Sequence, residues 1–141
     1  MKEPDQLKSE TLGLQARILI VEDQAIIAED LTEILGDFGC LVVGVARHCD
    51  EAWPMLETVR PDLVLMDLDS QRETTGLLAA VRIQQQTRVP VVCLTACTSV
   101  ELGPALEMEK TFGLVHKPIQ VDEFAAALRR ALGGLGKPSP S

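Results

Sequence analysis

The chain has 141 residues, a length typical of one domain, and a formal net charge of −8 at pH 7. This acidic balance argues against a nucleic-acid backbone as the main ligand and leaves cations and basic protein surfaces as plausible partners. No apolar run approaches the roughly 20 residues that span a bilayer, and the polar residues 1–15 do not form a secretory signal. We therefore expect a soluble, cytoplasmic protein that does not bind nucleic acid or membranes directly.

Composition also restricts how the core is built. Apolar residues make up 46% of the chain but aromatic residues only 3%, so aliphatic side chains have to fill the interior. The spacing of the four cysteines, Cys40, Cys49, Cys93 and Cys97, matches no zinc signature. Cys40 and Cys93 lie within apolar runs and are predicted to be small core residues. The cysteines are therefore expected to be reduced thiols.

Five short apolar runs have the length of β-strands. They cover residues 17–21, 40–46, 63–67, 89–94 and 112–116. Unbroken apolar runs of this length are typical of strands buried on both faces, as in a parallel sheet. The run that ends at Asp67 passes directly from four apolar residues into an acid. It is expected to be the central strand.

Helical patterns separate these runs. Directly after Asp23, apolar residues recur at helical spacing, and Gly39 is a good helix stop. The second helix is expected over about residues 50–59, where Pro54 should disturb the first turn. Residues 60–62 form the break before the central strand.

The second half of the chain continues the alternation. Residues 70–75 are polar and predict a loop, and a helix is expected from residue 76 to about residue 85. Thr98 or Ser99 can cap the next helix, and Gly103-Pro104 should kink or shorten it. Strands and helices therefore alternate five times, which predicts an α/β fold with a doubly wound, five-stranded parallel sheet.

The ends of the chain differ in composition from its middle. Residues 1–15 are predicted to be a flexible leader, and residues 16–133 the folded domain. The last helix is expected over about residues 121–132 and should end at Gly133-Gly134. Residues 134–141 have the composition of a linker.

Polar side chains stand at four of the predicted strand ends: Glu22-Asp23, Asp67, Thr95 and Lys117. Parallel strands end at the same edge of a sheet, so these side chains should form one site. Crowded carboxylates raise one another's pKa unless a cation is present, and oxygen ligands suit Mg²⁺. The arrangement fits an Asp nucleophile that accepts a phosphoryl group while a metal and a lysine neutralise the charge.

The sequence resembles the receiver domains of two-component response regulators. Four segments carry the resemblance, in the right order and at matching separations: residues 18–23, 63–67, 93–96 and 116–118. It covers about residues 16–132. It implies a flavodoxin-like fold with strand order 2-1-3-4-5 and a bound divalent ion, usually Mg²⁺.

The resemblance also implies a role for each residue of the site. Asp67 matches the phosphoacceptor, Thr95 the switch hydroxyl and Lys117 the lysine that pairs with the phosphoryl group. Glu22 and Asp23 resemble the acidic pair that helps to hold the metal. The metal ligands implied for this chain are Glu22, Asp23, Asp67 and, through its backbone carbonyl, Asp69. The resemblance further implies a cis peptide bond before Pro118.

Two positions depart from the family pattern. Receivers usually have an aromatic residue where this chain has Leu114, so we expect a shallow switch, centred on residues 98–116. Asp69 adds an acid two positions after the acceptor. This acid can add electrostatic load, assist metal binding, or be a solvated loop residue.

The favoured function is a phosphorelay receiver, a signalling switch that takes a phosphoryl group onto Asp67 from a phosphohistidine. The donor would be a sensor histidine kinase or a histidine phosphotransfer protein. An unknown downstream protein is also expected as a partner. A second copy, bound through the fourth helix, fifth strand and fifth helix, is a further candidate. Self-phosphorylation and self-dephosphorylation would make it a switch with some transfer chemistry rather than a conventional enzyme.

Two alternatives are open. One is a degenerate receiver that acts through protein contacts without phosphorylation. The other is a phosphatase, since Asp67-Leu68-Asp69 also resembles the Asp-x-Asp motif of haloacid-dehalogenase-type phosphatases, with Thr95, Lys117 and Asp122 as later motifs. Turnover of free phosphomonoesters would favour the phosphatase.

Overall fold

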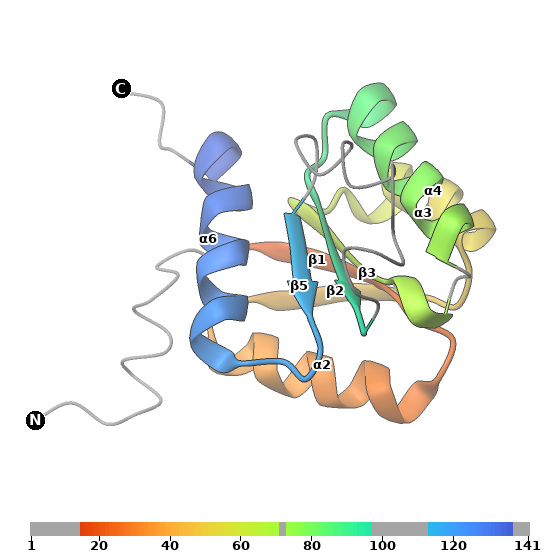
Figure 1. The fold of residues 1–141 in the computed structure, drawn as a ribbon. Coiled ribbons are helices and arrows are strands. Elements are labelled where there is room, and N and C mark those ends of the chain that lie inside the picture. Colours follow the sequence, from red (N-terminus) through yellow and green to blue (C-terminus); the bar gives the residue numbers. More distant parts are fainter. Residues whose placement is uncertain (1–14, 71–72, 97–112, 137–141) are drawn as a thin grey trace, which may run out of the picture.

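The centre of the protein is a five-stranded parallel sheet (Figure 1), seen in a computed structural model that describes residues 15–70, 73–96 and 113–136. Its strands are β1 (Arg17–Val21), β2 (Leu41–Ala46), β3 (Leu63–Asp67), β4 (Val91–Thr95) and β5 (Gly113–His116). Their order is β2-β1-β3-β4-β5, and every neighbouring pair is parallel. The predicted doubly wound fold and strand order are confirmed.

Helices cover both faces of the sheet (Figure 1). They are α2 (Ala25–Asp37), α3 (Cys49–Val59), α4 (Glu73–Thr87) and α6 (Val121–Gly136). α2 and α6 pack on one face, and α3 and α4 pack on the other. None of these helices is long and apolar enough to cross a membrane.

Alternate residues of the inner strands supply the two cores. In β1, Ile18 and Ile20 pack with α2 and α6, whereas Leu19 and Val21 pack with α3 and α4. β3 and β4 alternate in the same way, and every residue of both strands is buried. This two-sided burial explains why the strands are unbroken apolar runs in the sequence. It leaves the strand ends as the place for polar side chains.

Several helix boundaries differ from the sequence prediction. α4 begins at Glu73 instead of residue 76, and α6 continues to Gly136 through the glycines expected to end it. Glycine lowers helix propensity by about 1 kcal/mol without clashing, so a packed helix can continue through it. Pro54 lies beyond the first turn of α3, which starts at Cys49 and buries Ala52 and Leu56. Gly39, by contrast, takes φ 88° just after α2, as a helix stop should.

The predictions for the remaining segments lie outside the described residues. They concern the leader before residue 15, the helix with Gly103-Pro104 and its cap at Thr98 or Ser99, and the tail after residue 136. The cis peptide bond expected before Pro118 is present. Cys40 and Cys93 are buried free thiols, as predicted, and burial raises the pKa of Cys40 to about 11.

Candidate phosphoacceptor site

Asp67 stands at the carboxyl end of the central strand, where neighbouring strands also end. β3 lies between β1 and β4, so the ends of these strands meet at one edge of the sheet. Asp67 pairs with Leu94 of β4, which places Thr95 one residue further along that edge. The Asp67 residue is only 1% exposed and Thr95 is fully buried. An ionised carboxylate in such a place needs a partner.

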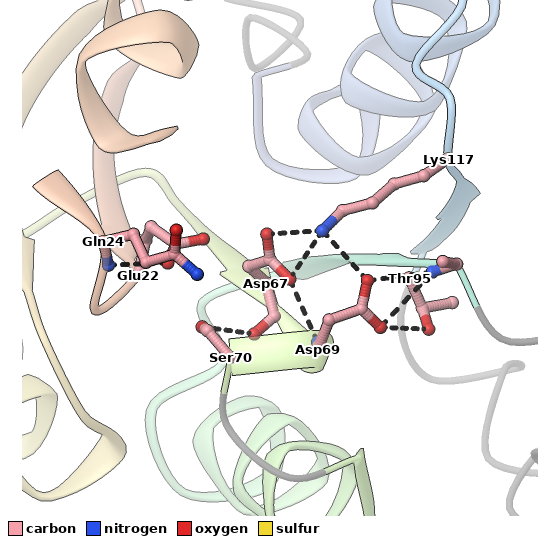
Figure 2. A network of polar contacts seen from close by, with 8 residues as sticks. Glu22, Gln24, Asp67, Asp69, Ser70, Thr95 and Lys117 are labelled. Atoms are coloured by element: carbon pink, nitrogen blue, oxygen red, sulfur yellow. Dashed lines mark hydrogen bonds and ion pairs between the residues drawn. The ribbon is translucent and has the colours of Figure 1, made fainter. Parts of the chain in front are cut away.

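Lys117 supplies that partner from just beyond the end of β5, the strand on the far side of β4. Its backbone N–H donates to the carbonyl of Thr95 at 2.8 Å, which holds the residue just beyond the strand. The ammonium then reaches across to Asp67, with Nζ 3.0 Å from Oδ1 and 2.8 Å from Oδ2 (Figure 2). The same Nζ lies 2.9 Å from Oδ2 of Asp69. One cation therefore bridges two carboxylates.

A short 3-10 turn, η1 (Leu68–Ser70), carries the chain away from Asp67. The backbone N–H of Asp69 donates to Oδ1 of Asp67 at 3.0 Å, and the Ser70 hydroxyl donates to the Asp67 carbonyl at 3.0 Å. An aspartate that accepts from the backbone two residues on is a recurrent turn motif. The turn fixes both the Asp67 carboxylate and the direction of Asp69.

The Asp69 carboxylate is held by groups from two other strand ends (Figure 2). The Thr95 hydroxyl donates to Oδ1 at 3.0 Å, and the Ala96 backbone N–H lies 3.0 Å from Oδ2 and 3.3 Å from Oδ1. With Lys117, the carboxylate has three donors although its side chain is 30% exposed. It is therefore not a solvated loop acid.

The acidic end of β1 lies on the other side of Asp67 (Figure 2). Glu22 is 1% exposed, and the Gln24 backbone N–H donates to its Oε2 at 2.8 Å. Its Oε1 and the Oδ1 of Asp23 are buried and accept no hydrogen bond from the described part of the chain. These two oxygens lie near a third carboxylate, that of Asp67. A bound cation would offset the repulsion among the three carboxylates and give the two oxygens a partner.

The residues present fit a hard divalent cation. Glu22, Asp23 and Asp67 offer oxygen ligands only, and two of their buried oxygens accept no hydrogen bond from the residues that the structure describes. Across residues 15–70, 73–96 and 113–136, no three His, Cys, Asp or Glu side chains already converge as a metal site. The Asp69 carboxylate turns to Thr95 and Lys117 instead of to these acids. The metal ligands expected from the sequence stay a prediction.

Burial and neighbouring carboxylates disturb the protonation of Glu22. Burial is the largest cause, and interactions with Asp67 and Asp23 add to it, so that the pKa of Glu22 rises from 4.5 to about 7. The pKa values of Lys117 and Asp69 are shifted partly by the ion pair between them. Burial alone would lower the pKa of Lys117 and raise that of Asp69. Hydrogen bonds and attraction to Asp67 and Asp69 outweigh burial at Lys117 and raise its pKa. Hydrogen bonds from Lys117, Ala96 and Thr95, together with the charge of Lys117, lower the pKa of Asp69.

The raised pKa of Glu22 predicts a pH dependence of stability in the absence of metal. Between pH 4.5 and about 7 the folded chain binds more protons than the unfolded chain, so stability should fall as pH rises through this window. We expect the free energy of unfolding, measured with urea in the presence of EDTA, to drop by about 1–2 kcal/mol. The shifts of Asp69 and Lys117 lie outside this window, since their pKa values move below 3.8 and above 10.5.

Glu22→Gln should remove most of this drop because the amide does not titrate. Glu33→Gln is the matched control, since Glu33 is exposed on α2 and has the same charge. An equal drop in the Glu22→Gln variant would contradict the assignment to Glu22.

Glu22, Asp67, Thr95 and Lys117 lie at one edge of the sheet, where the sequence prediction placed their strand ends (Figure 2). That prediction missed the backbone donor of Ala96, because a main-chain N–H leaves no mark in the sequence. It also missed the Ser70 hydroxyl, although Asp-x-x-Ser after a strand is a signal for a local turn. Leu114 is confirmed in β5, where it packs partly buried against the core on the α3 and α4 side.

Known proteins resemble this chain over most of its length. The transcriptional regulatory protein PdtaR of Mycobacterium tuberculosis is 34% identical over 116 residues, which are 82% of this chain and 56% of that protein. The phyllosphere-induced regulator PhyR of Methylorubrum extorquens is 33% identical over 120 residues, 84% of this chain and 44% of that protein. The chain thus spans about half the length of these curated relatives.

Solved structures agree with the sequence matches. The response regulator PhyR from Brucella abortus superposes with a TM-score of 0.74 at 31% identity, covering 93% of this chain and 54% of that one. The family model of the response regulator receiver domain matches residues 18–129, which include all four polar strand ends. The chain therefore belongs to the response regulator receiver domain family.

Proposed function

We propose that this receiver takes a phosphoryl group onto Asp67 from a phosphohistidine and acts as a phosphorylation-dependent switch in two-component signalling. The donor would be a sensor histidine kinase or a histidine phosphotransfer protein in the cytoplasm. One observation carries the proposal: the buried Asp67 carboxylate ends the central strand and is paired with the Lys117 ammonium at 2.8 and 3.0 Å. This is a fixed nucleophile beside a fixed positive charge.

Transfer of the phosphoryl group needs only the donor, the side chains of this site and solvent. An Asp67 carboxylate oxygen attacks phosphorus, a P–O bond forms, and the P–N bond to the imidazole breaks. The bonding electron pair goes to the leaving nitrogen, which is protonated by solvent. Lys117 would stabilise the negative charge that gathers on the phosphoryl oxygens, and the Thr95 hydroxyl, which donates to Asp69 in this structure, would donate to one of them.

A divalent cation, when bound, would neutralise charge between the acids and the phosphoryl oxygens. Glu22, Asp23 and Asp67 would hold it, together with the backbone carbonyl of Asp69. The buried oxygens of Glu22 and Asp23 support this assignment because they accept no hydrogen bond from the described residues.

Mg²⁺ should therefore stabilise the folded chain. A ligand that binds only the folded state adds about 1.4 kcal/mol at ten times its Kd, which raises the Tm by roughly 3–5 °C for a domain of this size. Asp23→Ala should abolish most of the rise, whereas Asp30→Ala, on the exposed surface of α2, should keep it. Thermal unfolding with and without Mg²⁺ gives the answer, and an equal rise in the Asp23→Ala variant would move the metal site elsewhere.

The proposed function is tested with acetyl phosphate and Mg²⁺. We expect one phosphoryl group per chain, in a bond that hydroxylamine cleaves, as for an acyl phosphate. Steady turnover of a free phosphomonoester would support the phosphatase alternative. Absence of labelling by both acetyl phosphate and a phosphohistidine protein would support the degenerate receiver. One observation favours that alternative: the Asp69 carboxylate already accepts from Thr95, Ala96 and Lys117.

The proposed partners beyond the donor follow from the family. A downstream protein would read the phosphorylated state, and a second copy of the chain would bind through the predicted helix around Gly103-Pro104, β5 and α6. The helix that the sequence predicts around Gly103-Pro104 lies outside the described residues.

A further inference from the structure

Asp69 occupies an anion site that the proposed reaction needs. Three donors from two separate strand ends converge on its carboxylate: the Thr95 hydroxyl, the Ala96 backbone N–H and the Lys117 ammonium. Their distances to the carboxylate oxygens are 3.0, 3.0 and 2.9 Å. A side chain that faced only water would not collect a hydroxyl, an amide and an ammonium in this way (Figure 2).

The same donors lie within reach of a group on Asp67. The Lys117 ammonium touches Asp67 and Asp69 at once, with Nζ 2.8 Å from Oδ2 of Asp67 and 2.9 Å from Oδ2 of Asp69. The Asp69 backbone N–H also donates to Oδ1 of Asp67, so the two carboxylates are fixed side by side by one turn. A phosphoryl group on Asp67 would bring three oxygens and about 1.5–2 negative charges into this small space. It would compete with Asp69 for the donors.

We propose that Asp69 is a positioning residue whose carboxylate fills the phosphoryl-oxygen site of the unphosphorylated chain and has to leave it when Asp67 is phosphorylated. This inference rests on the proposed function, because it assumes that Asp67 is the acceptor. The Asp69 carboxylate would occupy the positions of the phosphoryl oxygens, although a carboxylate is planar and has one negative charge, whereas a phosphoryl group is tetrahedral and has about 1.5–2.

Two consequences follow. Affinity for a phosphoryl group, or for an analogue of it, is reduced by the fraction of molecules in which the site is already filled. Thr95 and Ala96 are also engaged before phosphorylation, so their arrangement changes less when the phosphoryl group arrives. A ligand shifts an equilibrium between two conformations only as far as its affinities for them differ. Asp69 makes the unphosphorylated conformation more like the phosphorylated one, so this difference in affinity becomes smaller. This is a cause of a shallow switch that is independent of Leu114.

Beryllofluoride with Mg²⁺ is the probe, since it mimics a phosphoryl group on an aspartate. Its Kd is measured by calorimetry for the wild type, Asp69→Ala, Asp69→Asn and the control Glu33→Gln. We expect Asp69→Ala to bind about tenfold more tightly than the wild type, and Asp69→Asn to fall between them, because an amide oxygen is a weaker acceptor than a carboxylate. Glu33→Gln removes the same charge from the exposed surface of α2 and should bind as the wild type does.

Amide hydrogen exchange of Ala96 reports the contact itself. Without beryllofluoride, the Ala96 N–H should exchange faster in Asp69→Ala than in the wild type, because its acceptor is gone. With beryllofluoride bound, the two rates should become alike. Equal Kd values for the wild type and Asp69→Ala, or unchanged exchange of Ala96, would overturn this inference and leave the proposed function intact. No binding by the wild type or any variant would overturn both.

Discussion

Asp67→Asn should reduce labelling by acetyl phosphate to background. The amide cannot form the acyl phosphate, and in the described part of the chain no other carboxylate both ends a central strand and lies on the Lys117 ammonium. The variant should remain folded, because it removes one of several crowded negative charges while Lys117 keeps Asp69 as a partner. Mass spectrometry of the intact chain measures the labelling, and circular dichroism checks the fold.

The matched control is Asp30→Asn on the exposed surface of α2, which should be labelled as fully as the wild type. Labelling of Asp67→Asn at the wild-type level, in a bond stable to hydroxylamine, would place the acceptor elsewhere. Peptide mapping of the labelled wild type then identifies the true site.

Lys117→Met should slow labelling by about 10²–10³-fold. Removing one fixed donor at a site where charge develops typically costs this much, and Lys117 is the one cation that reaches Asp67 among the described residues. Methionine is an unbranched side chain only one atom shorter than lysine, and it has no charge. The initial rate of phosphorylation by acetyl phosphate, at saturating Mg²⁺, measures the effect.

Arg130→Met is the control, because Arg130 is an exposed cation of α6 and its loss changes the net charge by the same amount. It should leave the rate within twofold of the wild type. A Lys117→Met rate equally close to the wild type would show that the phosphoryl charge is stabilised by other groups.

In the proposed reaction, Asp67 would supply the nucleophile, Lys117 the positive charge, and Asp69 an anion that competes for the same donors. Asp67→Asn and Lys117→Met should lose labelling, whereas Asp69→Ala should gain affinity. A general structural disturbance would not give opposite signs from neighbouring carboxylates of one turn.

The composition of the site was predictable from the sequence. Apolar runs that end in Glu22, Asp67 and Thr95 indicate buried parallel strands, and parallel strands end at one edge of a sheet. The order of the strands came from the family resemblance, and the structure confirms it. Helix ends were less predictable, since α4 starts earlier and α6 ends later than local signals indicate. A glycine costs a helix only about 1 kcal/mol relative to alanine, so it does not by itself end the helix.

The partners of Asp69 were decided by the tertiary structure alone. In the sequence, this acid fitted a metal ligand, an added charge or a loop residue equally well. Its real surroundings depend on the turn after β3 and on donors 27 and 48 positions away, at Ala96 and Lys117. The raised pKa of Glu22 has a similar origin, because it needs both burial and the carboxylate of Asp67 from the neighbouring strand. Residue spacing tells which strand ends meet, but only the folded chain determines which donor each oxygen faces.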